Sequence, residues 1–213
     1  MPPNPLESRA ARLGQGAKAL GLTLSQGQLD QLLGLLGLLE RWNRVYNLTG
    51  VRDLDRMVPF HLLDSLALAP WLRGGTVLDV GTGAGFPGLP LAILQPERGF
   101  TLLDSNGKKI RFIRQAAMEL GLGNVEPVQA RVESYPAREK FATILARAFA
   151  PLPRIIQLVR PLLGSPGVLL ASKGPGVEQE LPVVGGVVGE IRTHRLQVPF
   201  LEGERILVEF AVG

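Results

Sequence analysis

The most constraining feature of this chain is a glycine-rich stretch, VLDVGTGAGFPG, at residues 77–88. It is an apolar run that ends at an acidic residue and then breaks into four glycines. A strand that stops at such a turn and restarts as a helix aims backbone N–H groups at a ligand, and the missing Cβ atoms let that ligand approach. The stretch therefore predicts an α/β sheet with a nucleotide-like ligand at Gly81, Gly83 and Gly85.

The pattern after residue 76 extends this prediction to the rest of the chain. Short β-rich runs alternate with helical lengths, as in a parallel sheet wound with helices. We expect helices at 88–95, 107–122 and 152–163, and an antiparallel hairpin at the sheet edge near the end of the chain. The expected strands are 76–80, 100–103, 125–129, 141–146 and 168–172, followed by two weaker ones near 191–196 and 205–211.

The region before the glycine loop is expected to be helical. Ser25 and Gln28 stand in capping-box positions before an amphipathic leucine stripe, and residues 57–72 form a second helix with Pro59 near its start and Pro70 near its end. We therefore expect residues 1–72 to be a helical cap or lid over a cofactor-binding domain at 73–213. The 46% hydrophobic content is enough for both regions to pack as one globular unit.

Composition excludes several kinds of chemistry. The chain has no cysteine, which rules out disulfides, thiolate metal sites and cysteine nucleophiles. No run is long enough to span a bilayer, so we expect a cytoplasmic protein without a membrane partner, and we expect no metal. The net charge of +4 is uneven, because residues 105–160 hold ten Lys or Arg and only four acidic residues. One basic surface is expected.

The spacing of the glycines decides which ligand the loop suits. A dinucleotide loop needs a third glycine where this chain has Phe86, which disfavours a nicotinamide dehydrogenase. The loop is instead G-x-G-x-G led by Asp79, and Asp104 follows 23 positions after Gly81, at the end of the second strand. This looks like the first motif of the S-adenosylmethionine-dependent methyltransferases with a seven-stranded, Rossmann-like sheet, whose last strand is antiparallel. The alternatives are that Asp79 only caps its loop and that Asp104 only caps the next helix.

The class resemblance implies that the loop holds the methionine end of S-adenosylmethionine and that Asp104 holds the ribose. The acceptor is narrowed by what is missing. Carbon 5 of a pyrimidine needs a cysteine, and adenine amines are usually served by a proline-aromatic motif where this chain reads LARAFAPLP. Ribose hydroxyls need a base, and no acid follows the fourth strand to assist Lys173. Guanine N7 carries a free lone pair and needs only orientation and electrostatics.

Arg147 follows the fourth strand, at the edge where open α/β sheets bind ligands. Its guanidinium can hydrogen-bond the O6 and N7 edge of guanine, a phosphate or the carboxylate of the cofactor. A surface salt bridge is the alternative.

With these features in place, the chain resembles the bacterial ribosomal small-subunit methyltransferase G family, also called glucose-inhibited division protein B. The resemblance implies methylation of guanine N7 at one nucleotide of 16S rRNA, in a loop near the decoding site. It covers nearly the whole chain, and GTGAGFPG with RAFA is specific to the family. The matching segments are RWNRVYNLTGVRD (41–53), HLLDSLALAPWL (61–72), VLDVGTGAGFPGLPLAI (77–93), LLDSNGKKIRFIRQ (102–115), NVEPVQARVES (124–134), ARAFAPL (146–152), KGP (173–175) and GERILV (203–208).

The family resemblance also implies site residues. Many members have a leucine where this chain has Phe86, a change that is tolerable if the backbone does the binding. On the substrate side, His61 and Asp64 are one helical turn apart and are expected to pair. Lys173 is expected to meet RNA or to hold the pocket. The implied cofactor contacts are Gly81, Phe86, Val132, Glu133 and Arg147, and the implied residues near the acceptor are Asn47, Arg52, His61, Asp64 and Ser65.

Lys108, Arg111 and Arg114 recur on one helix face, opposite Ile110 and Ile113, and with Arg52 they are candidate RNA contacts. A solvated helix face is the alternative. The expected partner is 16S rRNA within the small ribosomal subunit or its precursor, with no obligate protein partner. Two other functions stay open: a methyltransferase for a small molecule or protein, and a cofactor-binding ribosome assembly factor without turnover.

Overall fold

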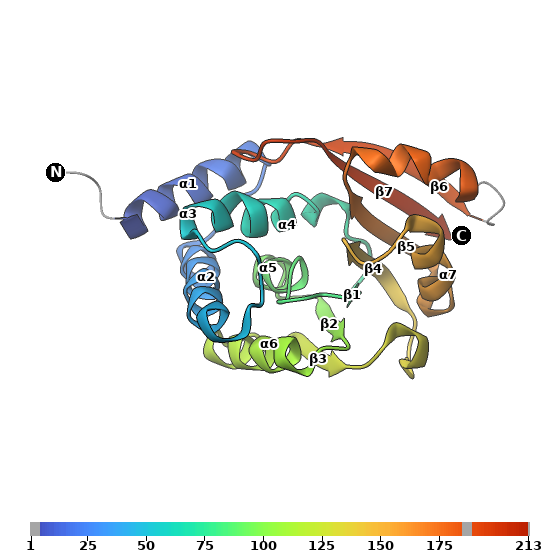
Figure 1. Cartoon of the computed structure of the whole chain (residues 1–213), viewed down its shortest axis with the longest axis horizontal. Helices are drawn as coiled ribbons and strands as arrows, with labels where there is room; N and C mark the ends of the chain where they lie inside the picture. Colours follow the sequence, from blue (N-terminus) through green and yellow to red (C-terminus); the bar gives the residue numbers. More distant parts are fainter. Residues whose placement is uncertain (1–4, 185–188, 213) are drawn as a thin grey trace.

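The computed structural model describes residues 5–184 and 189–212, and its centre is a mixed β-sheet (Figure 1). Among these residues the sheet has seven strands in the order β3-β2-β1-β4-β5-β7-β6. The expected strands are confirmed, with β5 beginning several residues earlier than predicted. The strands are β1 (Thr76–Val80), β2 (Gly99–Asp104), β3 (Val125–Gln129), β4 (Phe141–Arg147), β5 (Leu163–Lys173), β6 (Glu190–Leu196) and β7 (Arg205–Val212).

The register brings the ends of the central strands to one edge of the sheet. Val80 of β1 lies beside Leu103 of β2 and Ala146 of β4, and all of these pairings are parallel. β7 runs antiparallel to both β5 and β6 and lies between them, so the predicted terminal hairpin is confirmed. Because β7 is antiparallel, its first residue, Arg205, reaches the same edge at which the parallel strands end.

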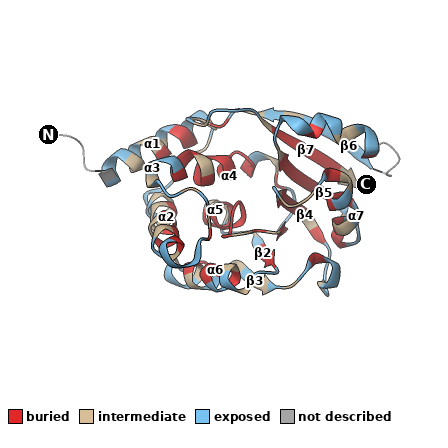
Figure 2. Ribbon diagram, in the orientation of Figure 1, coloured by how far each residue is buried: buried red, intermediate tan, exposed pale blue. Residues whose placement is uncertain are grey.

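Helices cover both faces of the sheet, and each face has its own apolar core (Figure 2). One core joins Leu145 of β4 and Leu207 of β7 to α5 (Gly88–Leu94), α6 (Gly107–Glu119) and the helices that precede β1. The other core contains Ile144 of β4 and is covered by α7 (Leu152–Val159). Short 3-10 turns complete the layers: η3 (Val132–Ser134), η4 (Arg160–Leu162), η5 (Pro175–Gln179) and η6 (Leu181–Val184).

Two long helices, α1 (Pro5–Ala19) and α2 (Gln26–Tyr46), precede the glycine loop. α2 begins with the predicted capping box between Ser25 and Gln28, and its leucines enter the core that also covers the sheet. The sequence pattern did not predict α1. The division into a lid at 1–72 and a domain at 73–213 stays a prediction, and residues 1–4, 185–188 and 213 of these ranges lie outside the described residues.

The second predicted helix, at 57–72, is broken into several pieces. They are α3 (Leu54–Met57), the π-helical turn η1 (Val58–Leu63), α4 (Asp64–Leu66) and the 3-10 turn η2 (Ala69–Trp71). Pro59 has no N–H to donate, and its carbonyl accepts from the N–H of Asp64, five residues on. Such wide turns are frequent at functional sites. This one lies over the edge of the sheet at which the parallel strands end.

Within the described ranges, no helix has the length and apolar character needed to cross a membrane.

Candidate functional site

Asp79, the last acidic residue before the glycine loop, anchors that loop through hydrogen bonds to its carboxylate. Its carboxylate is buried, and Oδ2 accepts hydrogen bonds from Thr82 Oγ1 at 2.6 Å and from the N–H of Gly88 at 2.9 Å. Burial raises the pKa of Asp79 to about 6. This is the geometry of a loop cap, the alternative considered for Asp79, and a direct contact with a cofactor stays a prediction.

The loop glycines have backbones that side chains rarely adopt. Gly81, Gly83 and Gly85 all have positive φ, at 65°, 64° and 83°. A Cβ at Gly81 would also lie 2.4 Å from Cδ2 of Phe149, whereas a Cβ at Gly83 would meet only the end of Lys109, at 4.0 Å. A Cβ at Gly81 would therefore clash with a side chain, whereas a Cβ at Gly83 would meet no close neighbour.

Asp104, at the end of β2, ties the glycine loop to the next turn. Its Oδ2 accepts from the N–H of Gly83 at 2.9 Å and its Oδ1 from the N–H of Asn106 at 2.8 Å. The N-cap of α6 is Asn106, so the alternative that Asp104 caps this helix is wrong. Each carboxylate oxygen keeps a further lone pair, and Asp104 lines an open cavity.

That cavity has a volume of about 330 Å³ and lies between the glycine loop and the ends of β2 and β3. It brings together four of the residues predicted to hold the cofactor, namely Gly81, Asp104, Val132 and Glu133. Val132 and Glu133 lie on its wall, and Glu133 is paired with Arg154 at 3.2 Å. An acid with free lone pairs beside open glycine backbone fits a ribose and its neighbouring groups. The lining residues include Gly81, Asp104, Lys109, Val132, Glu133, Ala148 and Phe149.

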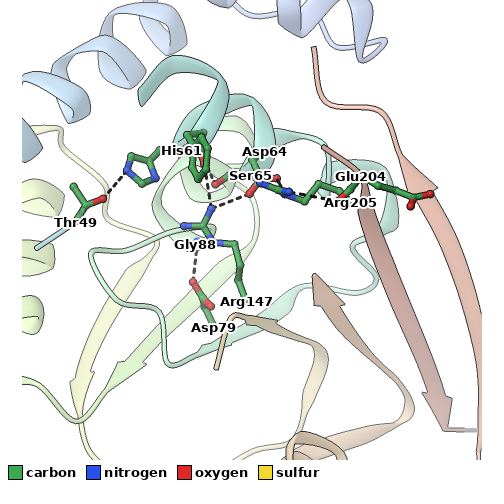
Figure 3. A network of polar contacts seen from close by, with 10 residues as sticks. Thr49, His61, Asp64, Ser65, Asp79, Gly88, Arg147, Glu204 and Arg205 are labelled. Carbon is green, nitrogen blue, oxygen red and sulfur yellow. Dashed lines mark hydrogen bonds and ion pairs between the residues drawn. The ribbon is translucent and has the colours of Figure 1, made fainter. Parts of the chain in front are cut away.

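A second cavity, of about 460 Å³, lies on the other side of Ala148, which lines both cavities. It contains most of the residues predicted for the acceptor side. Figure 3 shows how several of these side chains converge from η1, α4, β4 and β7. Its lining residues are Thr49, Gly50, Val51, Phe60, His61, Asp64, Arg147, Ala148, Ser172, Lys173, Gly174 and Arg205.

Asp64 forms the centre of this second cavity and carries two guanidinium partners. Arg147 Nη1 donates to Oδ2 at 2.9 Å, and Arg205 Nε donates to Oδ1 at 3.1 Å. The Asp64 side chain is 6% exposed, so its charge is compensated inside the protein rather than by water. Two cations against one carboxylate leave this wall of the cavity net positive.

His61 does not pair with Asp64, so that expectation is wrong. Its Nε2 lies 3.0 Å from Thr49 Oγ1, and its ring stacks on Phe86 with the centroids 4.8 Å apart. Burial and the nearby Arg147 lower the pKa of His61 to about 4. The imidazole is therefore neutral at neutral pH, and it offers an apolar ring face rather than a cation.

The other acceptor-side predictions have different outcomes. Asn47 is the left-handed C-cap of α2, and Ser65 donates to the carbonyl of His61. Lys173 donates to the carbonyl of Ala150 at 2.7 Å and to Glu180 at 3.1 Å, so it holds the pocket wall. Direct contacts of these residues with an acceptor stay predictions.

The candidate RNA residues are on the surface. Lys108, Arg111 and Arg114 are exposed on α6 while Ile110 and Ile113 are buried, as the spacing predicted. None of these three cations forms an ion pair with another described residue.

The last turns of α2 pack against the middle of α6, because Trp42 of α2 meets Phe112 of α6 with ring centroids 5.7 Å apart. Tyr46, 39% exposed, packs on Trp42 at the end of α2, and Arg52 is exposed in the segment that follows.

Sequence reasoning missed Arg205, Phe149 and Thr49. Arg205 begins an antiparallel strand, and only the position of β7 in the sheet brings it to Asp64. The signal for Phe149 was its place in the same RAFA motif as Arg147. Thr49 follows a helix end within a matched segment, and nothing in its neighbours indicated His61 as its partner.

The sequence profile of the rRNA small subunit methyltransferase G family (GidB) matches residues 28–207. The Ribosomal RNA small subunit methyltransferase G of Methylococcus capsulatus is 52% identical over 92% of this chain and 96% of its own length. The protein of the same name from Chromohalobacter salexigens is 50% identical over 93% of this chain and 95% of its own length.

Solved structures share the fold at lower identity. A magnesium protoporphyrin IX methyltransferase from Synechocystis, with bound S-adenosylmethionine, superposes with a TM-score of 0.60 at 20% identity, over 89% of this chain and 99% of the other. An S-adenosylmethionine-dependent methyltransferase from Aquifex aeolicus gives 0.57 at 19% identity, over 76% and 94%. The predicted fold class is therefore confirmed.

Proposed function

Since this chain belongs to the rRNA small subunit methyltransferase G family, we propose that it transfers the methyl group of S-adenosylmethionine to N7 of a guanine in 16S rRNA. The substrate would be the small ribosomal subunit or its precursor, at a site near the decoding centre. One observation carries the proposal: the cavity at Asp104 and the cavity at Arg147 meet at Ala148. A donor held in the first can therefore face an acceptor held in the second.

The cavity at Asp104 suits the adenosine part of the cofactor. Asp104 would accept the ribose hydroxyls through its free lone pairs, and Val132 and Glu133 would flank the adenine. The backbone of Gly81 and Phe86, with Arg147, would hold the methionine end. When bound, S-adenosylmethionine supplies an electrophilic methyl group on a positively charged sulfur.

The second cavity suits an acceptor that has no proton to lose. His61 has its Nε2 engaged by Thr49 and its Nδ1 buried, and Lys173 is engaged by a carbonyl and a carboxylate, so neither side chain is placed to take a proton from an acceptor in the cavity. Guanine N7 needs no base, only a lone pair held in line with the bond that breaks. Arg147 and Arg205 can donate to guanine O6 or to a phosphate.

The exposed cations on α6 supply a means of binding RNA outside the cavity. Lys108, Arg111 and Arg114 have no carboxylate partners among the described residues and would follow the phosphate backbone, and Arg52, exposed in the segment after α2, would add a further cation. The segment that carries Arg52 also carries Thr49, Gly50 and Val51, which line the second cavity. A small-molecule or protein acceptor would not require this arrangement of charge.

The test is to incubate the protein with radiolabelled S-adenosylmethionine and, separately, small subunits, bare 16S rRNA and whole ribosomes from cells that lack the enzyme. Strand cleavage specific for N7-methylguanine then maps the label. We expect label at one guanine, and none with Asp104→Ala, which should not bind the cofactor. Cofactor binding without label on any RNA would contradict the proposal and favour a non-catalytic assembly factor, whereas label on a small molecule or protein would favour another acceptor.

A further inference from the structure

The loop that follows β4 forms a wall that the two cavities share where they meet. Ala148 lines both of them and has a left-handed backbone with φ of 48°. The next residue, Phe149, packs against Gly81 of the glycine loop. A residue other than glycine in this conformation is costly and persists only where neighbouring contacts maintain it.

Two charged side chains hold the wall from behind. Lys173, the last residue of β5, donates to the carbonyl of Ala150 at 2.7 Å and to Glu180 Oε2 at 3.1 Å. Glu180, which follows η5, accepts a hydrogen bond from the N–H of Leu152, the first residue of α7. Lys173 thus fixes the end of the wall loop, and Glu180 fixes the start of the helix that continues it.

The pair is partly shielded from water. The side chains of Lys173 and Glu180 are 12% and 29% exposed. Burial acts to raise the pKa of Glu180, but the hydrogen bonds from Leu152 and Lys173 prevail and hold it below its usual range. Lys173 therefore has a fixed carboxylate and a fixed carbonyl as partners, and it is not a free cation at the cavity.

We propose that Lys173 and Glu180 are positioning residues that hold residues 148–151 as a fixed wall and thereby align the two cavities for methyl transfer. The proposal rests on the proposed function for its effect on turnover. Neither residue touches the reacting atoms in this scheme. In-line displacement is sensitive to placement, and a displacement of about 1 Å can cost on the order of a hundredfold in rate. Loss of either partner should therefore lower kcat more than it weakens binding.

The experiment compares Lys173→Met, Lys173→Arg and Glu180→Gln with the wild-type chain, and Glu178→Gln is the matched control. Glu178 lies in the same turn, is exposed and makes no hydrogen bond or ion pair with a described residue, so its replacement removes the same charge. We expect Lys173→Met and Glu180→Gln each to lower kcat by about tenfold to a hundredfold, with KM for small subunits and for S-adenosylmethionine changed less than about threefold. The double variant Lys173→Met with Glu180→Gln should resemble either single variant, because the Lys173–Glu180 ion pair is lost in all three.

Lys173→Arg should keep part of the activity, and thermal unfolding of each variant controls for loss of folded protein. A purely structural role would lower the unfolding temperature and leave the kcat of the folded fraction unchanged, which would overturn the proposal. An RNA contact by Lys173 would raise KM for small subunits in Lys173→Met and leave Glu180→Gln like wild type, which would also overturn it.

Hydrogen exchange at the amide of Leu152 gives a readout that does not depend on activity. Because Glu180 accepts from this N–H, its exchange should become faster in Glu180→Gln and in Lys173→Met, and not in Glu178→Gln. If the wild-type chain methylates no RNA, the proposed function fails, and this exchange rate then decides whether the pair holds the wall. Unchanged exchange in both variants would overturn the positioning role by itself.

Discussion

The two glycines that begin the loop should respond very differently to the same substitution. Gly81 and Gly83 have nearly equal backbone angles, with φ of 65° and 64°. A Cβ at Gly81 would lie 2.4 Å from the ring of Phe149, whereas the space at Gly83 is open to 4.0 Å. Gly81→Ala and Gly83→Ala therefore share the energetic cost of a left-handed backbone, and Gly81→Ala has the additional cost of overpacking.

The shared cost is the left-handed backbone, about 1–2 kcal/mol for a residue with a Cβ. The second cost is overpacking against Phe149, which adds about 1–3 kcal/mol. Gly81→Ala should thus lower the free energy of unfolding by about 2–5 kcal/mol in total, and Gly83→Ala by about 1–2 kcal/mol.

Urea unfolding of each variant at a constant m-value measures the stability difference. Phe149→Ala in the Gly81→Ala background removes the obstructing ring, so the double-mutant cycle should show a favourable coupling of about 1–3 kcal/mol. Equal destabilisation by the two glycine variants, or no coupling with Phe149→Ala, would refute the reasoning that this ring covers Gly81.

Three further outcomes are expected. Asp64→Asn should lower the free energy of unfolding by about 2–4 kcal/mol in urea titrations, because it leaves two mostly buried guanidiniums without their carboxylate; a loss below 1 kcal/mol would contradict this. In the folded state the pKa of Asp79 is raised to about 6, so the contribution of this carboxyl group to the free energy of unfolding falls as pH rises from 4 to 6.5. The pKa of His61 is lowered to about 4, so the contribution of this imidazole to the free energy of unfolding rises over the same window. In urea titrations across this window, Asp79→Asn leaves the His61 effect, so the free energy of unfolding should rise with pH by up to about 3 kcal/mol. His61→Gln leaves the Asp79 effect, so the free energy of unfolding should fall by a similar amount. Equal slopes in the two variants would contradict these two pKa shifts. Lys108→Glu with Arg111→Glu should raise KM for small subunits about tenfold with unchanged cofactor affinity, and an unchanged KM would remove α6 from the RNA surface.

Much of the fold follows from local pattern. The central strands β1, β2 and β4 are short, mainly apolar runs, so their positions can be identified without knowledge of their neighbours. The helix at 57–72 was predicted as continuous because its apolar spacing is helical, but Pro59 shifts the hydrogen bonding to a wide π turn. α1 was missed because its leucines are few and Gly14 and Gly16 weaken its pattern. Gly16 in fact lets α1 approach Leu63, where a Cβ would lie 2.4 Å from that side chain.

The cofactor side of the site was easier to predict than the acceptor side. Asp79, Gly81 and Asp104 belong to two successive strand ends, so their spacing along the chain reflects their spacing in the fold. The partners of Asp64 come from β4 and β7, and neither can be inferred from the helix that carries it. The expected pair with His61 assumed a regular helix without competing partners, and two guanidiniums took the carboxylate instead.

The position of β7 has a consequence for how the protein is made. Arg205 and Asp64 are 141 residues apart, and β6 is joined to the sheet only through β7. A nascent chain that has not yet released residues 205–212 from the ribosome leaves Asp64 without its second guanidinium and cannot pair residues 167–173 of β5. The edge formed by these residues is then a template for pairing with other chains. Translation arrest just before β7 should therefore yield an aggregation-prone product whose acceptor cavity lacks Arg205, so synthesis of β7 both covers the edge of β5 and completes this cavity.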